Sequence, residues 1–125
     1  MLIAQISDMH IKAPGKLLYN RIDTAGYLER AVAHLLKLEP RPEVVLATGD
    51  LVDGGTAEEY ALLRQLLAPL PMPVYFIPGN HDRRDTLRAA FADCGYLPAE
   101  GFLQYAVETR DVRLLALDTL VDGKP

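Results

Sequence analysis

Three short segments of the sequence carry side chains that suit metal binding and phosphate chemistry. Residues 8–10 read Asp-Met-His, residues 49–50 read Gly-Asp, and residues 79–82 read Gly-Asn-His-Asp. Carboxylate oxygens and imidazole nitrogens suit Mn, Fe, Zn or Co, and an amide oxygen adds a weaker donor. Two divalent ions that share Asp50, opposed by Asp8, Asp50 and a bridging hydroxide, would leave a positive site. Such a site attracts a phosphodiester anion.

Each segment taken alone has a simpler explanation. Asp8 could be a solvated loop acid, Gly49-Asp50 is a common turn pair, and Asp82 could cap a helix. These explanations do not account for a feature that all three segments share: each directly follows a short apolar run. This shared placement favours a functional site over three unrelated turns.

The apolar runs predict the strands that would position these side chains. Residues 2–6, 44–48 and 74–77 are short, apolar and rich in Val and Ile, which is typical of parallel strands covered on both faces. Apolar periodicity predicts a helix over 22–38. Thr56 and Glu59 form a capping box that opens a second helix, which ends before 69–73.

The third helix and a terminal hairpin complete the prediction. Asp85 is predicted to cap a helix that carries Leu87, Ala90, Phe91 and Cys94 on its apolar face, with Gly95 as its stop. Strands are predicted at 103–108 and 112–117, joined through 109–111. The order β-α-β-α-β-α-β-β indicates an α/β fold with a mostly parallel sheet, in which strand ends and their ligands meet at one edge.

Composition limits the other classes of function. The chain has 125 residues and a formal net charge of -4, which indicates one domain and no basic surface for a nucleic-acid polymer. Its single cysteine, Cys94, cannot form an internal disulfide and is predicted to lie in the core. The N-terminus resembles neither a signal peptide nor a membrane span, so we expect a cytoplasmic protein without a membrane partner.

The motifs "DMH", "GDLVDGG" and "GNHD", in this order, resemble those of the calcineurin-like metallophosphoesterases. The chain is most similar to the class III cyclic-nucleotide phosphodiesterases and bacterial glycerophosphodiesterases, from "ISDMH" through "LYNRID" and "GTAEEY" to "LALDT". The resemblance implies a four-layer αββα sandwich. Residues 1–125 correspond to its N-terminal half and end before the later histidine motifs that complete both metals in the family.

The resemblance also implies a role for each motif residue. Asp8 and His10 match ligands of the first metal, and Asp50 matches the ligand that bridges two divalent ions. Asn80 matches a second-metal ligand that also approaches the substrate phosphate. His81 matches a residue that assists the phosphoryl oxygens or the leaving group, and Asp82 would orient it.

The implied reaction is hydrolysis of a small phosphodiester, a cyclic nucleotide or a glycerophosphodiester, by in-line attack of a metal-bridging hydroxide. Asp118 matches a structural position. His34, on the first predicted helix, is not expected to replace the later histidines. We therefore expect the chain alone to bind at most one metal and to hydrolyse phosphodiesters poorly.

Other interpretations stay open from the sequence. A receiver-like, Mg-binding signalling module fits the length and the alternation of elements, and a non-catalytic binding remnant of the family is a third possibility.

Several other residues have open roles. Arg83 and Arg84 could contact substrate phosphate or form a solvated helix start, and Tyr19 and Asn20 could shape a pocket. Asp53 could support the site from behind its ligands or be a simple turn residue, and the turn is favoured. Because half of a two-sheet fold leaves a sheet face uncovered, an exposed apolar surface and a homo-oligomer are expected.

Overall fold

The computed structural model describes residues 1–124, which form an α/β fold with the predicted order of elements. The elements are β1 (Ile3–Ile6), α1 (Thr24–Lys37), β2 (Val44–Thr48), α2 (Ala57–Leu67), β3 (Val74–Ile77), α3 (Arg84–Ala90), the short 3-10 helix η1 (Ala92–Cys94), β4 (Tyr105–Glu108) and β5 (Arg113–Ala116).

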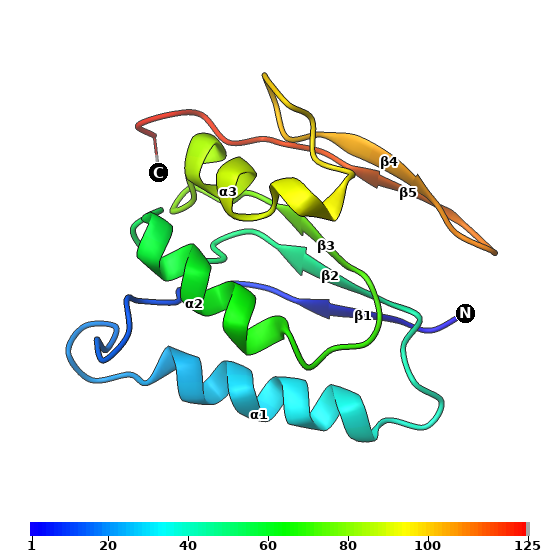
Figure 1. Cartoon of the computed structure of the whole chain (residues 1–125), viewed down its shortest axis with the longest axis horizontal. Helices are drawn as coiled ribbons and strands as arrows, with labels where there is room; N and C mark the ends of the chain where they lie inside the picture. The colour runs from blue at the N-terminus through cyan, green and yellow to red at the C-terminus, as the bar shows by residue number, and fades with distance from the viewer. Residues whose placement is uncertain (125) are drawn as a thin grey trace.

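The first three strands form a parallel sheet in the order β1-β2-β3, as the alternating pattern predicts. Ile3 pairs with Val44, and Val45 pairs with Val74. The predicted bounds of β2 and β3 match those observed, and β1 begins one residue later than predicted. In Figure 1 the three arrows point the same way, so the loops that follow these strands leave from one edge.

The three helices form a layer over one face of this sheet, with α2 in contact with both α1 and α3. Because side chains alternate along a strand, Val45 and Ala47 of β2 face the helices and are buried. The predicted apolar stripes of the helices supply the other side of the core. Its buried helical members are Leu28, Val32, Leu35, Tyr60, Leu63, Leu67 and Leu87.

The hairpin of β4 and β5 is antiparallel, as predicted, but it forms a second sheet. This sheet lies beside β3, where the Tyr105 hydroxyl donates to Phe76 O at 2.6 Å (Figure 1). Tyr105 stacks with Tyr96 at 4.8 Å between ring centroids, and Tyr96 meets Tyr75 of β3 at 4.9 Å. On the outer side, Leu115 and Leu117 are 67% and 63% exposed. These two neighbouring leucines give the hairpin an apolar outer side.

The third helix differs from the prediction at its start and on its apolar face. Arg83 occupies the N-cap without a side-chain bond and Asp85 lies in the first turn, so the assignment of Asp85 as the cap is wrong. Gly95 ends the segment with a φ of 84°, as expected. Cys94 is exposed, and its assignment to the core is wrong, because the chain changes to a 3-10 helix after Phe91 and the 3.6-residue stripe is lost.

Asp118 connects the segment after β5 to α3. Its buried carboxylate accepts hydrogen bonds from Nε and Nη2 of Arg84 at 2.7 and 2.9 Å. It also accepts the backbone N–H groups of Leu103 at 2.6 Å and Leu120 at 3.0 Å. This arrangement agrees with a structural role for Asp118 and assigns the Arg84 guanidinium to the same cluster.

Replacing Asp118 by asparagine should lower the free energy of unfolding by about 2–3 kcal/mol at pH 7, since hydrogen bonds to a charged group are weakened. Burial alone would raise the pKa of Asp118, but the bonds from Arg84 hold that pKa below its ordinary value. The stabilisation is therefore present above the ordinary carboxyl pKa of about 3.9 and is lost as pH falls through the folded-state pKa.

Urea unfolding from pH 7 to pH 2 measures this difference, with the exposed Glu100→Gln as control. The gap between the wild-type chain and Asp118→Asn should narrow below about pH 4. A gap that stays constant across this range would contradict the assignment.

Candidate metal centre

The loops after the three parallel strands meet at one edge of the sheet. The N–H of Asp8 donates to Gly49 O at 3.0 Å, and the N–H of His10 donates to Asp50 O at 2.9 Å. A parallel bridge between Ile11 and Val52 continues this contact beyond the strands. The sequence segments that carry the candidate ligands therefore lie side by side.

Three candidate ligands have an uncommon backbone conformation. Asp8, His10 and Asp50 have φ values of 54°, 44° and 45°, in the left-handed region that non-glycine residues rarely adopt. Each such residue costs on the order of 1–3 kcal/mol, and such strain concentrates at functional sites. The loop contacts described above stabilise these conformations.

Gly79 allows the third loop to approach Asp50 closely. A Cβ atom on Gly79 would lie 2.3 Å from the Asp50 nitrogen and 2.4 Å from its Oδ1, so a larger residue has no room. Two residues on, the N–H of His81 donates to Asp50 Oδ1 at 2.9 Å. Asp50 is thus the point at which the loops after β2 and β3 join.

Asp8, His10 and Asp50 offer ligand atoms that all lie within 4.8 Å of one another. His10 Nε2 is 3.6 Å from Asp50 Oδ2, while His10 Nδ1 is 3.3 Å from Asp53 Oδ1. With its proton on Nδ1, His10 would donate to Asp53 and present the lone pair of Nε2 to an ion shared with Asp50. This is the usual orientation of a metal-binding histidine held by a second carboxylate, so these residues fit a divalent ion.

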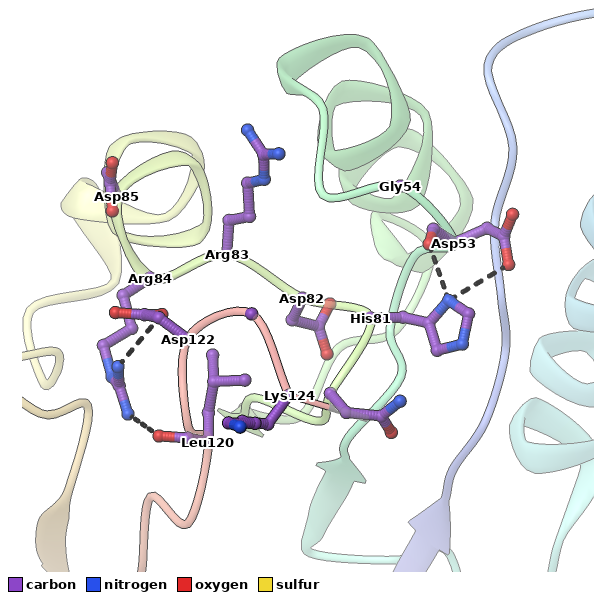
Figure 2. A pocket seen from close by; sticks show the side chains of 12 residues that line it. Asp53, Gly54, His81, Asp82, Arg83, Arg84, Asp85, Leu120, Asp122 and Lys124 are labelled. Atoms are coloured by element: carbon purple, nitrogen blue, oxygen red, sulfur yellow. Dashed lines mark hydrogen bonds and ion pairs between the residues drawn. The ribbon is translucent and has the colours of Figure 1, made fainter.

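Asp53 makes contacts that favour the supporting interpretation over the turn. It lies three residues after Asp50 and contacts both site histidines, so its assignment as a simple turn residue is wrong. The Nδ1–H of His81 donates to the Asp53 carbonyl at 2.7 Å and lies 3.4 Å from Oδ1 (Figure 2). The second acid of "GDLVD" was the signal available in the sequence.

The rings of His10 and His81 meet edge to face, with centroids 4.7 Å apart. His10, Asp53 and His81 also satisfy the distance for a metal-ligand group. In that group, however, the two Nδ1 atoms are engaged as hydrogen-bond donors to Asp53. The arrangement instead leaves Nε2 of each ring for chemistry.

Charges near Asp53 shift two pKa values in opposite directions. Burial alone would raise the pKa of Asp53, but Lys12 Nζ, 2.9 Å from Oδ2, and His10 hold it below its ordinary value. The hydrogen bond to the Asp53 carbonyl, aided by the charges of Asp50, Asp53 and Asp82, raises the pKa of His81. His81 therefore holds a proton more readily than an isolated histidine.

Asp82 does not orient His81, contrary to the expectation from the sequence. Its buried carboxylate accepts the N–H groups of Gly79, Leu51 and Val52 at 2.8, 3.1 and 3.3 Å, and the Tyr60 hydroxyl at 2.7 Å. Burial raises the pKa of Asp82, and these bonds oppose that effect. Asp82 therefore ties the loop after β3 to the loop after β2.

Glu59 holds the loop that carries Asp53. Its carboxylate accepts the N–H groups of Asp53 at 2.9 Å and Gly54 at 2.7 Å. The predicted pair with Thr56 is present, because Thr56 Oγ1 accepts the Glu59 N–H at 3.3 Å and donates to Glu59 Oε1 at 2.9 Å. One buried glutamate thus links the start of α2 to the site.

The remaining predicted residues lie around this centre. Asn80 is exposed and lines a cavity of 660 Å³. Asp53, His81 and Arg83 line the same cavity (Figure 2). Tyr19 and Asn20 form a turn with φ values of 51° and 54°. His34 lies exposed on α1, outside both groups of candidate ligands found among residues 1–124.

Replacing Asp53 by alanine should weaken binding of Zn²⁺ about 10- to 100-fold, since His10 loses the carboxylate that orients it. Isothermal titration of the folded variant measures this change, and circular dichroism checks the fold. Asp85→Ala, in the same cavity but without a contact to either histidine, is the matched control. Equal affinity of the two variants would contradict the role assigned to Asp53.

Comparison with known proteins shows where this arrangement occurs. The profile of the calcineurin-like phosphoesterases matches residues 1–124. A probable glycerophosphodiester phosphodiesterase of Arcobacter nitrofigilis is 38% identical over 124 residues, covering 99% of this chain and 45% of the relative. A 3′,5′-cyclic adenosine monophosphate phosphodiesterase of Pseudomonas aeruginosa is 32% identical over 123 residues, covering 98% of this chain and 43% of the relative. The chain thus spans less than half the length of these relatives.

Proposed function

Since the chain belongs to the calcineurin-like phosphoesterase family, we propose that it carries the first half of the active site of a metal-dependent phosphodiester hydrolase. The observation that supports this most directly is the convergence of Asp8, His10 and Asp50 at one sheet edge. The relatives are named for glycerophosphodiesters and for a cyclic nucleotide. Both compounds are phosphodiesters, and we propose this substrate class.

Asp8, His10 and Asp50 would hold one divalent ion, and Asp50 with Asn80 would contribute to a second. Mn, Fe, Zn and Co all suit these oxygen and nitrogen donors. When bound, such ions polarise the phosphoryl group and lower the pKa of water from about 15.7 to about 7. Three protein ligands suffice for a catalytic ion with an open position, so the first site should be the tighter one.

His81 is proposed to donate a proton to the leaving oxygen. Its Nδ1 is fixed on the Asp53 carbonyl, which leaves Nε2 as the atom that can exchange a proton with substrate. The raised pKa of His81 keeps more of the protonated form near neutral pH. A positioned acid of this kind contributes about 10²- to 10⁴-fold to the rate. The exposed Asn80 amide, one residue earlier, would bind a phosphoryl oxygen.

The sequence left two alternatives open, a receiver-like module and a non-catalytic binding domain. The family match argues against the receiver-like module. A non-catalytic binding domain would have no need for the oriented Nε2 atoms of His10 and His81. The histidine geometry therefore supports an enzyme over a binding remnant.

The proposal is tested by metal content after dialysis and by hydrolysis of bis(4-nitrophenyl) phosphate. We expect one tightly held ion for each chain and slow hydrolysis that both EDTA and Asp8→Ala abolish. Hydrolysis that survives both treatments would overturn the proposed function. Two tightly held ions with fast turnover by the isolated monomer would overturn the ligand assignment.

Location and assembly stay predictions from the sequence. Within residues 1–124 no helix combines the length and apolarity that crossing a membrane requires. A cytoplasmic location and a homo-oligomer are parts of the proposal, and the exposed Leu115 and Leu117 support the second. Light scattering of the purified chain tests the oligomer.

A further inference from the structure

A second cavity opens directly beside the first metal site. It has a volume of 410 Å³ and lies between the loop after β1, the turn at 18–22 and the start of α1. Asp8 and His10 form its boundary with the metal site, so a substrate held at that site would reach into it. Its lining consists of Ile6, Ser7, Asp8, Met9, His10, Leu18, Ile22, Thr24, Tyr27, Leu28 and Ala31.

The lining of this cavity is predominantly apolar. Apart from Asp8 and His10 at the metal edge, its only polar side chains are those of Ser7, Thr24 and Tyr27. Two of these are occupied, since Ser7 donates to Asp8, and Thr24 donates to the His10 carbonyl at 3.1 Å. Among residues 1–124, no lysine, arginine or glutamate lines it. An anionic substrate group would therefore lose hydration there without gaining a partner.

Tyr27 gives the cavity an aromatic rim. Its side chain is 62% exposed, and the guanidinium carbon of Arg30 lies 4.4 Å from the centre of its ring. This cation–π contact restrains the ring while leaving much of it uncovered. An exposed, restrained ring beside an apolar cavity favours a planar partner over a flexible alkyl chain.

A strained turn holds the opposite wall. Tyr19 and Asn20 both have positive φ values, and hydrogen bonds of 2.9 and 3.0 Å pair Leu18 with Ile22 across them. Because Leu18 and Ile22 line the cavity, the turn fixes its outer wall. Tyr19 itself is 77% exposed between them, so the turn does not gain stability by burying this ring.

The two cavities lie on either side of the pair formed by His10 and His81, and their linings differ in polarity. His10 lines the apolar cavity and His81 lines the 660 Å³ cavity, and the two rings are in contact. The larger cavity carries charged groups of both signs at Asp85, Arg83 and Lys124. A phosphodiester centred on the two rings would therefore meet an apolar wall on one side and a polar wall on the other.

We propose that the cavity beside Asp8 and His10 binds an aromatic group of the phosphodiester substrate, as the base of a nucleotide would provide. The proposal rests on the proposed function, because the phosphate must be held at the metal site. It adds a specificity determinant, to which Ile22 and Tyr27 contribute, that distinguishes aromatic from small polar ester groups.

The test is to titrate two phosphodiester probes into the ¹⁵N-labelled chain with Zn²⁺ present and to record the chemical shifts of the backbone amides. The probes are 3′,5′-cyclic AMP, which carries a purine, and glycerophosphoglycerol, which carries neither a ring nor a cation. Both should shift Asp8 and Asn80, and only cyclic AMP should shift Ile22, Tyr27 and Ala31. The double variant Ile22→Ser, Tyr27→Ala should weaken cyclic AMP binding about tenfold and leave glycerophosphoglycerol binding unchanged. Leu115→Ser, an exposed apolar change on β5, is the matched control.

Three outcomes would overturn the proposal. If cyclic AMP shifts Asp8 and Asn80 but not Ile22, Tyr27 and Ala31, the aromatic site is wrong and the proposed function stands. If neither probe shifts Asp8 or Asn80, the proposed function fails, and this inference fails with it. Shifts of Ile22 and Tyr27 that depend on protein concentration without any probe would show that a second copy of the chain occupies the cavity.

Discussion

Replacing Asp50 by alanine is expected to abolish tight metal binding and, with it, hydrolysis of bis(4-nitrophenyl) phosphate. Asp50 offers Oδ2 toward His10 Nε2 and accepts the His81 N–H through Oδ1, so it serves the ligand set and the loop after β3 together. Loss of a residue that only orients a ligand costs about 10- to 100-fold in metal affinity. Loss of this shared ligand should exceed that range.

The control for this variant is Asp50→Asn, which keeps an oxygen for the His81 N–H but removes the charge. Isothermal titration with Zn²⁺ should find both variants deficient, while circular dichroism finds the asparagine variant folded. If Asp50→Asn bound Zn²⁺ as tightly as the wild-type chain, the charge of Asp50 would have no part in metal binding.

Replacing Asp82 by alanine is expected to cost about 3–5 kcal/mol of unfolding free energy, a large fraction of the stability of a small domain. The change leaves the N–H groups of Gly79, Leu51 and Val52 and the Tyr60 hydroxyl without their acceptor. Each buried donor left in this way costs about 1–3 kcal/mol, partly offset by relaxation and water. Urea unfolding measures the loss.

This variant also separates two roles for Asp82. Asp82→Asn keeps one acceptor oxygen and should lose less stability than Asp82→Ala, while Asp85→Ala, exposed in the next turn, should lose almost none. An unchanged free energy of unfolding in Asp82→Ala would contradict the structural role. If Asp82→Ala changed only the pKa of His81 and left the free energy of unfolding unchanged, the orienting role that the sequence suggested would be supported.

The arrangement of elements could be predicted because local patterns determine it. The runs at 44–48 and 74–77 are apolar throughout, which suits strands buried on both faces, and both were found with the predicted bounds. Helix stripes were predicted well where the 3.6-residue period continues, as in α1 and α2. Cys94 was misplaced because the helix changes its period after Phe91, which no local propensity in that segment signals.

The site was predictable in position but not in its contacts. Strand ends in a parallel sheet share an edge, so the meeting of Asp8, His10 and Asp50 follows from topology. Which carboxylate faces which histidine depends on loop conformation, and here on several positive φ values. For that reason the sequence indicated Asp82 as the residue that orients His81, whereas the structure shows that Asp53 contacts His81 and that Asp82 holds the loops together.

The most direct test of this account is a long-range ¹H–¹⁵N spectrum of the histidine rings during titration with Zn²⁺. We predict that Nε2 of His10 takes the shift of a metal-bound nitrogen while its Nδ1 stays protonated against Asp53, and that His34 does not change. Coordination through Nδ1 of His10, or zinc-dependent change at His34 alone, would contradict the metal centre described for Asp8, His10 and Asp50.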